Sequence, residues 1–259
     1  MTTQLEIAMH RPGARAWLTL IRAETKMVVR DTAGLLVPIG LPLLILVMNG
    51  LGTSTQELPG LDGLTAFDVY VIPIVIAIVV ATIGVVNMPS FLAYYRRGGV
   101  LRRLAVTPAN PAMVLAAQVV TSIAQTTVGI VLALTVALLA FDAHPPRNPG
   151  MALGVVVLAA LAMYAIGLLI AAIAPTGNAA VAIGLVLFFG MGATGGMFGP
   201  VVNLPDVVAR VGEVLPFGAV TAAVGDAWAG QTPEPLHLIS LVAAIVISGL
   251  GAARFFRWE

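Results

Sequence analysis

The sequence predicts an all-α membrane protein whose chain crosses the bilayer six times. Two features of its composition support this class, because 59% of the 259 residues are hydrophobic and only 10% are charged. An ordinary soluble domain carries about a quarter charged residues, so a soluble fold could not hide this much apolar surface. The third observation is a series of apolar segments long enough to cross the hydrocarbon core as helices. They cover residues 33–52, 69–93, 111–140, 151–174, 179–200 and 236–253.

The basic residues fall in three groups, which lie before the first segment, between the second and third, and after the sixth. They are Arg11, Arg15, Arg22, Lys26, Arg30, Arg96, Arg97, Arg102, Arg103, Arg254 and Arg257. The other loops hold Arg147 and Arg210 alone. Because Lys and Arg accumulate in cytoplasmic loops, we expect a multi-pass protein of the cell membrane with both termini in the cytoplasm.

Residues 12–31 are expected to form an amphipathic helix that lies along the membrane surface. One side carries polar residues every three or four positions, and the opposite side carries apolar residues. The polar side consists of Arg15, Thr19, Arg22, Lys26 and Arg30, and the apolar side of Ala14, Trp17, Ile21 and Val28. Such a helix anchors the chain among membrane lipids, and contact with a cytoplasmic partner is left open as a second role.

The six segments contain no Asp, Glu, Lys or Arg, and this composition argues against several functions. Ion-coupled transporters usually keep ionisable residues inside the membrane. An intramembrane enzyme needs a base, a nucleophile or metal ligands. Cysteine is absent and the three histidines lack ligand spacing, so no metal site is expected. A net charge of +1 argues against a nucleic-acid partner.

The chain also lacks the motif with which many proteins bind ATP. Its single lysine, Lys26, is followed by Met27 and does not stand in a G-x-x-x-x-G-K-[ST] phosphate loop. If this protein moves a compound uphill, energy must therefore arrive from another subunit through a cytoplasmic loop.

The stretch "YYRRGGVLRRLAVTP" at residues 94–108 is the best candidate for that loop. A short helix from Tyr95 to Leu104 would expose arginines and present apolar side chains, and its two glycines would allow another backbone to come close. Two interpretations remain open. The segment is either a docking surface for a partner or an ordinary cluster of cytoplasmic positive charge.

In this loop the chain resembles the permeases of ABC type-2 transporters, in the subgroup associated with drug and antibiotic export. Those proteins carry R-x-x-G-V-L-R-R-L-x-x-T-P between spans two and three. The matching residues here are Gly99, Val100, Leu101, Arg102, Arg103, Leu104, Thr107 and Pro108. The resemblance extends over essentially the whole chain, through an Arg30–Asp31 step before the first span and a Leu215–Pro216 step after the fifth.

The resemblance implies a single permease domain over residues 1–259, with an extracellular re-entrant helical hairpin within 201–235. It implies that residues 95–104 are a coupling helix in a cleft of a separate cytoplasmic ATPase. Two ATPases would serve two permeases, in a homo- or heterodimer, and ATP and Mg would bind the ATPase with no cofactor in this chain. The implied coupling residues are Arg97, Gly98, Gly99, Val100, Leu101, Arg102, Arg103 and Leu104, and those of the connecting helix are Arg22, Lys26, Arg30 and Asp31.

This sequence departs from the family pattern at two places. Tyr94 and Tyr95 stand where family members often have an acidic residue, and Thr32 stands where a proline commonly follows the Arg–Asp step. A salt bridge made by the family's acidic residue is therefore in doubt here.

Two features of the predicted spans have alternative interpretations. Gln118, Thr121, Ser122 and Gln125 share one helix face, which forms either a wall of a substrate path or hydrogen bonds between helices. Gly192, Gly195, Gly196 and Gly199 allow either close helix packing or a hinge or dimer seam.

We therefore expect a permease subunit that exports hydrophobic or amphiphilic compounds and is not itself an enzyme. The uncharged membrane segments suit such a cargo better than a small ion. Export of a lipid or another envelope component is the alternative within transport, and a non-transporting scaffold or sensor subunit is the alternative outside it.

Overall fold

The computed structural model describes residues 13–53, 56–61, 63–97 and 112–255. Within them the fold is a bundle of helices with no strand, only an isolated bridge between Glu57 and Thr65. Six helices are long and apolar enough to cross a membrane. The predicted all-α class with six spans is thus confirmed.

The spans follow the predicted segments closely, with an additional helix before the first. The chain runs through α1 (Ala14–Arg30), α2 (Thr32–Gly52), a second span assembled from four short elements, α6 (Ala112–Ala140), α7 (Pro149–Ile173), α8 (Gly177–Thr194) and α11 (Pro235–Phe255). The elements of the second span are η1 (Phe67–Val71), α3 (Ile72–Ala81), η2 (Thr82–Asn87) and α4 (Met88–Arg97). Between α8 and α11 lie η3 (Val201–Asn203), α9 (Asp206–Val214) and α10 (Pro216–Trp228).

The second span is the centre of the bundle. Its sequence is apolar on all sides, as expected for a helix surrounded by other helices, and α2, α6, α7, α8 and α10 all pack against it. It also begins earlier than predicted. Because the helix starts at Phe67, Asp68 lies in its first turn and is fully buried, so this span does contain one acidic residue.

The η2 segment is π-helical, and two neighbouring helices touch its backbone through glycines. A Cβ atom on Gly167 of α7 would lie 2.0 Å from the carbonyl oxygen of Gly84. A Cβ atom on Gly184 of α8 would lie 2.4 Å from the carbonyl oxygen of Val85. Such distances leave no room for any side chain, so glycine is what lets these helices approach the central span.

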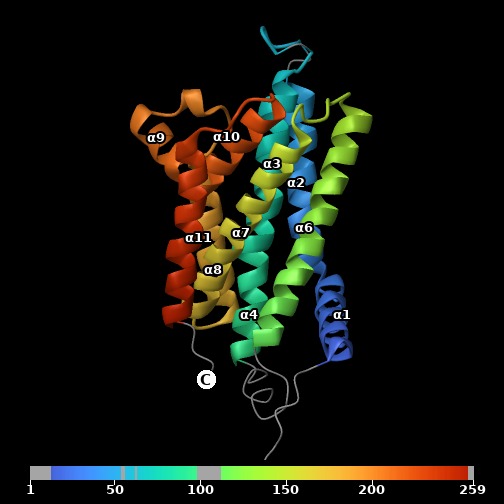
Figure 1. Ribbon diagram of the computed structural model, residues 1–259, viewed down its shortest axis with the longest axis vertical. Helices are drawn as coiled ribbons and strands as arrows, with labels where there is room; N and C mark the ends of the chain where they lie inside the picture. Colours follow the sequence, from blue (N-terminus) through green and yellow to red (C-terminus); the bar gives the residue numbers. More distant parts are fainter. Residues whose placement is uncertain (1–12, 54–55, 62, 98–111, 256–259) are drawn as a thin grey trace, which may run out of the picture.

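The bundle has two ends, and the charged residues of the sequence are divided unequally between them. The end that we call the basic end holds α1, the last turn of α4, the α7–α8 turn and the last turn of α11 (Figure 1). Its exposed basic residues are Arg15, Arg22, Lys26, Arg30 and Arg254. The opposite, acidic end holds seven acidic residues and two arginines, which are Glu57, Asp68, Asp142, Asp206, Glu213, Asp226, Glu234, Arg147 and Arg210. Which of the two ends faces the cytoplasm stays a prediction.

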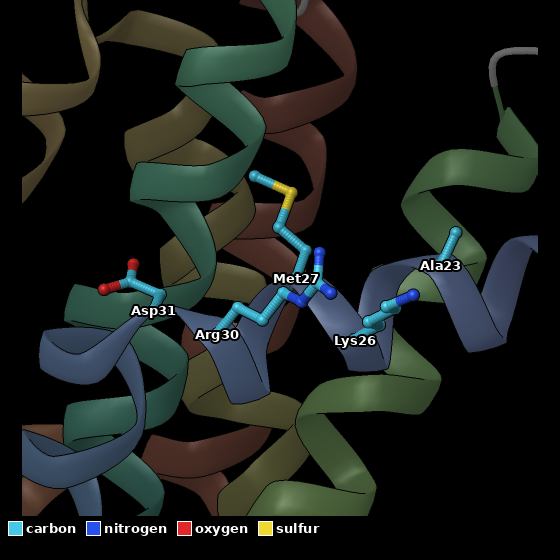
Figure 2. A pocket seen from close by; sticks show the side chains of 5 residues that line it. All are labelled: Ala23, Lys26, Met27, Arg30 and Asp31. Carbon is cyan, nitrogen blue, oxygen red and sulfur yellow. The ribbon is translucent and has the colours of Figure 1, made fainter.

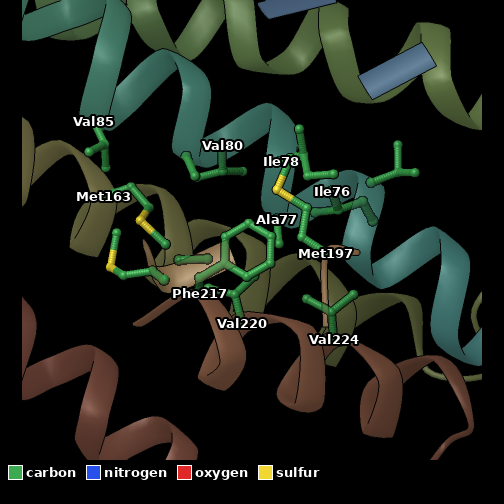
Figure 3. Close-up of a cluster of buried hydrophobic side chains, with 14 of the residues drawn as sticks. Ile76, Ala77, Ile78, Val80, Val85, Met163, Met197, Phe217, Val220 and Val224 are labelled. Carbon is green, nitrogen blue, oxygen red and sulfur yellow. The ribbon is translucent and has the colours of Figure 1, made fainter. Parts of the chain in front are cut away.

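The helices α9 and α10 form a hairpin at the acidic end (Figure 1), with a bend of 80° between them. Pro216 begins α10, where its fixed φ favours the first helical position. Figure 3 shows Phe217, Val220 and Val224 of α10 against Ile76 and Ala77 of the central span. The segment begins and ends at the same end of the bundle, as a re-entrant hairpin does, and its entry into lipid stays a prediction.

Labelling of single cysteines tests the sidedness directly, because the natural sequence contains no cysteine. Cysteines placed at Asp142 and Gln231 are expected to react in intact cells with a membrane-impermeant maleimide. Cysteines at Val100 and Thr176 are expected to react only after the membrane is opened. Labelling of Val100 from outside would contradict both the orientation and the proposed coupling segment.

Candidate functional site

The predicted coupling segment falls largely outside the part of the chain that the structure describes. Residues 98–111 are not described, and Arg97 is the last residue of α4. What the structure does place is the surroundings of the segment, since α4 leads into it at the basic end and α6 begins after it at Ala112.

The connecting helix α1 packs on the protein through its apolar side. It contacts α6 and α2, with Val28 buried and Trp17 and Ile21 half-buried. Leu20 and Met27 belong to a small apolar cluster with Tyr95 and Val114, so protein covers much of the side that was expected to enter lipid.

The predicted polar residues of α1 are placed differently from one another. Arg22, Lys26 and Arg30 are exposed. Asp31 lies between the two helices, where its Oδ1 accepts a hydrogen bond of 3.1 Å from the backbone N–H of Gly34. The Arg–Asp step is therefore the point at which α1 ends and α2 begins, with Asp31 as the N-cap of the first span.

A buried hydrogen bond joins α1 to the end of α4, immediately before the predicted coupling segment. The hydroxyl of Tyr95 donates to Oε2 of Glu24 over 2.7 Å and lies 2.8 Å from Sδ of Met27. Glu24 is 5% exposed and Tyr95 is 8% exposed. These two groups therefore connect α1 to α4. Family members often have their acidic residue near position 95, whereas here the tyrosine stands at that position and the acidic residue, Glu24, lies in α1.

Glu24 was missed in the sequence, although a signal was present. It falls on the apolar side of α1 between Ile21 and Val28, where a carboxyl must find a buried partner. Burial raises the pKa of the Glu24 carboxyl above its usual value near 4.5, and the hydrogen bond from Tyr95 opposes that rise. With the pKa raised in the folded state, the contribution of Glu24 to stability is fully present at acid pH and is lost as the pH rises through the folded pKa.

Substituting Tyr95 by phenylalanine is expected to destabilise the protein by about 1–3 kcal/mol, because the buried Glu24 carboxyl loses its donor. Glu24→Gln keeps an acceptor for Tyr95 and removes the charge, so it should cost less and should abolish the acid-side gain in stability. The midpoint of thermal unfolding in detergent, measured from pH 4 to pH 8, checks both variants. Equal melting of Tyr95→Phe and the wild type would contradict the importance of this contact.

The polar side chains of α6 lie inside the single chain rather than on its surface. Gln118, Thr121, Ser122 and Gln125 are all buried. The Nε2 group of Gln125 donates a hydrogen bond of 2.7 Å to the carbonyl oxygen of Gly34 in α2. Among the described residues, Gln118 Oε1 and Thr121 Oγ1 have no hydrogen-bond partner. The role of these residues in a substrate path stays a prediction.

Asn87 of η2 donates to the same carbonyl oxygen as Gln125. This residue was not identified from the sequence. Its Nδ2 group donates to the carbonyl oxygen of Gly34 over 2.9 Å and to Oε1 of Gln125 over 3.1 Å. The reason lies four residues after Gly34, where Pro38 has no N–H to offer the carbonyl. Two side-chain amides from other spans supply the missing hydrogen bonds, as an apolar environment requires.

Because Asn87 and Gln125 donate to the same carbonyl, the stability losses caused by substituting them are expected to be non-additive. Asn87→Leu or Gln125→Leu alone leaves Gly34 with one amide donor, and each should cost about 0.6 kcal/mol, typical of an interhelical hydrogen bond in membranes. The double variant leaves the carbonyl unpaired, which adds about 1 kcal/mol. The direct hydrogen bond between Asn87 and Gln125, worth about 0.6 kcal/mol, is lost already in either single variant and offsets part of this. The double variant should therefore still cost more than the two single losses together. Thermal unfolding of the four proteins in detergent measures this coupling, and simple additivity would contradict the shared-carbonyl account.

The glycines near residue 195 end the fifth span. Gly196 has φ +91°, and the N–H of Met197 donates to the carbonyl oxygen of Gly192, so α8 closes at Thr194 rather than at residue 200. Gly195 packs against Phe217 and Gly218 of α10, while Gly199 is exposed. The role of these glycines as a hinge or dimer seam stays a prediction.

The described residues contain no group of three His, Cys, Asp or Glu side chains that could hold a metal ion. The acidic residue of the second span, Asp68, accepts hydrogen bonds from Thr65 and from the backbone N–H of His144, at 2.8 and 2.7 Å. Trp228 of α10 donates in turn to the carbonyl oxygen of His144 over 3.0 Å. These contacts join the loops that contain Thr65 and His144 to the α9–α10 hairpin at the acidic end. They give the buried Asp68 carboxylate its hydrogen-bond donors and thus a structural role.

Six spans, an amphipathic helix before the first and a helical hairpin before the last define a multi-pass α-helical membrane protein. Residues 15–224 match the ABC-2 type transporter family, from the start of α1 into α10. The chain therefore belongs to the ABC-2 type transporter family, whose members are membrane permease subunits of ABC transporters. A comparison with curated proteins gave no match.

Proposed function

We propose that this protein is the permease of an ATP-driven exporter that moves hydrophobic or amphiphilic compounds, such as drugs and antibiotics, out of the cell. Two copies, or one copy with a related permease, would work with two cytoplasmic ATPase subunits. ATP binding would close the ATPases, shift the segment at residues 95–104 and reshape a path between the permeases.

The observation that carries this proposal is the uncharged polar interior. Buried amide and hydroxyl groups of α6 lie among apolar spans, and Gln118 Oε1 and Thr121 Oγ1 have no hydrogen-bond partner among the described residues, whereas the charged side chains lie toward the ends of the bundle. Such an interior can hydrogen-bond to an amphiphile without the cost of burying a charge. A small ion would instead require charged or multiply coordinating ligands within the membrane.

The proposed partnership with an ATPase is supported by the contact between Glu24 and Tyr95. This contact places α1 and the approach to residues 98–104 side by side at the basic end, so an ATPase bound there would act on both elements together.

Reconstitution with the companion ATPase in vesicles tests the function. We expect efflux of lipophilic dyes and antibiotics that depends on ATP, and ATP hydrolysis that rises when such compounds are added. The permease alone should hydrolyse no ATP above background. Transport of a fluorescent phospholipid with no dye efflux would assign the alternative cargo, an envelope lipid. Absence of transport and of any stimulation would instead support a scaffold or sensor subunit and overturn the proposal.

A further inference from the structure

A small open groove lies on the C-terminal half of α1, next to the start of the first span. Ala23, Lys26, Met27, Arg30 and Asp31 line it (Figure 2). The first span begins at Thr32, so the groove sits within about two turns of the hydrocarbon boundary. A position so close to the start of the first span is where the headgroups of membrane lipids are expected.

The groove is positively charged. Lys26 and Arg30 are four residues apart and project from the same side of α1. Among the described residues, neither side chain forms an ion pair. The carboxylate of Asp31 points away from both cations in Figure 2, and its Oδ1 accepts the hydrogen bond from Gly34. Two free cations therefore face the groove, while the nearby acidic group is engaged elsewhere.

Exposed apolar side chains flank these cations on one side, and the half-buried Met27, which packs against Tyr95 and Val114, lies on the other. The side chain of Met27 extends from the groove toward the bundle. On the other flank, Leu18 is 53% exposed and Val29 is 58% exposed. Exposed aliphatic side chains beside a basic stripe are typical of a helix that contacts acyl chains and anionic headgroups together. An acidic protein surface would satisfy the cations but leave these aliphatic groups without a suitable partner.

We propose that this groove binds the phosphate group of an anionic phospholipid, with Lys26 and Arg30 as its ligands. The lipid is the source of the phosphate because the groove adjoins the membrane boundary, where phospholipid is concentrated. Bound there, the lipid fixes the exposed side of α1, while Glu24 and Tyr95 fix the opposite side to α4. The proposal concerns the membrane surface and does not depend on the identity of the cargo.

The test compares lipid binding by the full chain purified in detergent. Native mass spectrometry during titration with phosphatidylglycerol, or with phosphatidylcholine as the neutral reference, gives an apparent Kd for each lipid. A variant with Lys26→Gln and Arg30→Gln should bind phosphatidylglycerol about 25-fold more weakly, from about fivefold for each basic residue near anionic lipid. Its binding of phosphatidylcholine should be unchanged.

The matched control carries Arg15→Gln and Arg22→Gln, which remove the same charge from the same helix outside the groove. Its affinity for phosphatidylglycerol should fall no more than about threefold, because these arginines would contribute only a general attraction between positive charge and anionic lipid. Equal losses in the two double variants would overturn the site, since only net charge would matter. Displacement of the lipid by millimolar inorganic phosphate would assign a free anion instead.

A third outcome concerns the ATPase. If the Lys26 and Arg30 variant binds phosphatidylglycerol normally but no longer captures the companion ATPase, the groove is a protein contact and the lipid proposal fails. Both side chains are exposed, so the variant should melt at the wild-type temperature and a loss of binding cannot be assigned to unfolding.

Discussion

Gly99→Trp is expected to abolish ATP-dependent export while the protein still accumulates in the membrane. The family pattern places Gly99 in the helix that would enter a cleft of the ATPase, where an indole side chain would hold the two backbones apart. Membrane insertion should be unaffected because the residue falls outside the six apolar spans. Dye efflux from cells and capture of the companion ATPase measure the two consequences separately.

Leu101→Asp is also expected to abolish ATP-dependent export, through the cost of burying a charge rather than through steric bulk. An aspartate in an apolar contact buries an unpaired charge, which costs several kcal/mol and would prevent docking. Arg96→Ala is the control from the same segment, since an exposed charge contributes about 0–1 kcal/mol. If export survives both Gly99→Trp and Leu101→Asp, the docking surface lies elsewhere, and α1 is then the best candidate.

The six spans could be predicted because their signal is a local one. A run of about 20 apolar residues without charge specifies a membrane helix wherever it occurs, and segments such as 236–253 needed no partner to be recognised. The ends were less certain. The fifth span was expected to reach Pro200 but closes six residues earlier, because Gly196 adopts the left-handed conformation that ends a helix.

The polar contacts inside the bundle could not be predicted in the same way. Pro38 in the sequence indicates that the carbonyl of Gly34 lacks the backbone N–H that would normally donate to it. The sequence does not indicate which side chains donate in its place. Asn87 and Gln125 stand 53 and 91 residues away from Gly34, and packing alone brings them together. Glu24 was detectable as a charge on an apolar helix face, whereas its partner Tyr95 required the structure.

The structure also gives different roles to the clustered glycines near residue 195 and to three glycines that stand in separate spans. The glycines near residue 195 chiefly end a helix, whereas Gly84, Gly167 and Gly184 allow three spans to touch at the π-helical segment. None of the latter three was selected from the sequence, because isolated glycines in apolar helices are common and only the contact distances distinguish them.

Gly167→Ala is expected to be the most damaging small substitution in the membrane part of the protein. The added methyl group would lie 2.0 Å from the carbonyl oxygen of Gly84 and 3.3 Å from Cε of Met88. The methionine can move, but the carbonyl belongs to the backbone of the buried central span. The helix α7 must therefore shift away, and overpacking of this kind costs about 1–3 kcal/mol or more.

Gly154→Ala provides the matched control, since it makes the same change in the same helix. Among the described residues, no atom of another helix lies within 4 Å of the Cβ position there, and the residue is exposed in the single chain. Alanine should be tolerated or should stabilise the helix by up to about 1 kcal/mol. We expect Gly167→Ala to lower the yield of folded protein and the midpoint of thermal unfolding in detergent, and Gly154→Ala to change neither for the worse. Indistinguishable behaviour of the two variants would mean that α7 does not approach the central span as closely as the structure shows, and the shared contact surface of α7, α8 and η2 would then have to be revised.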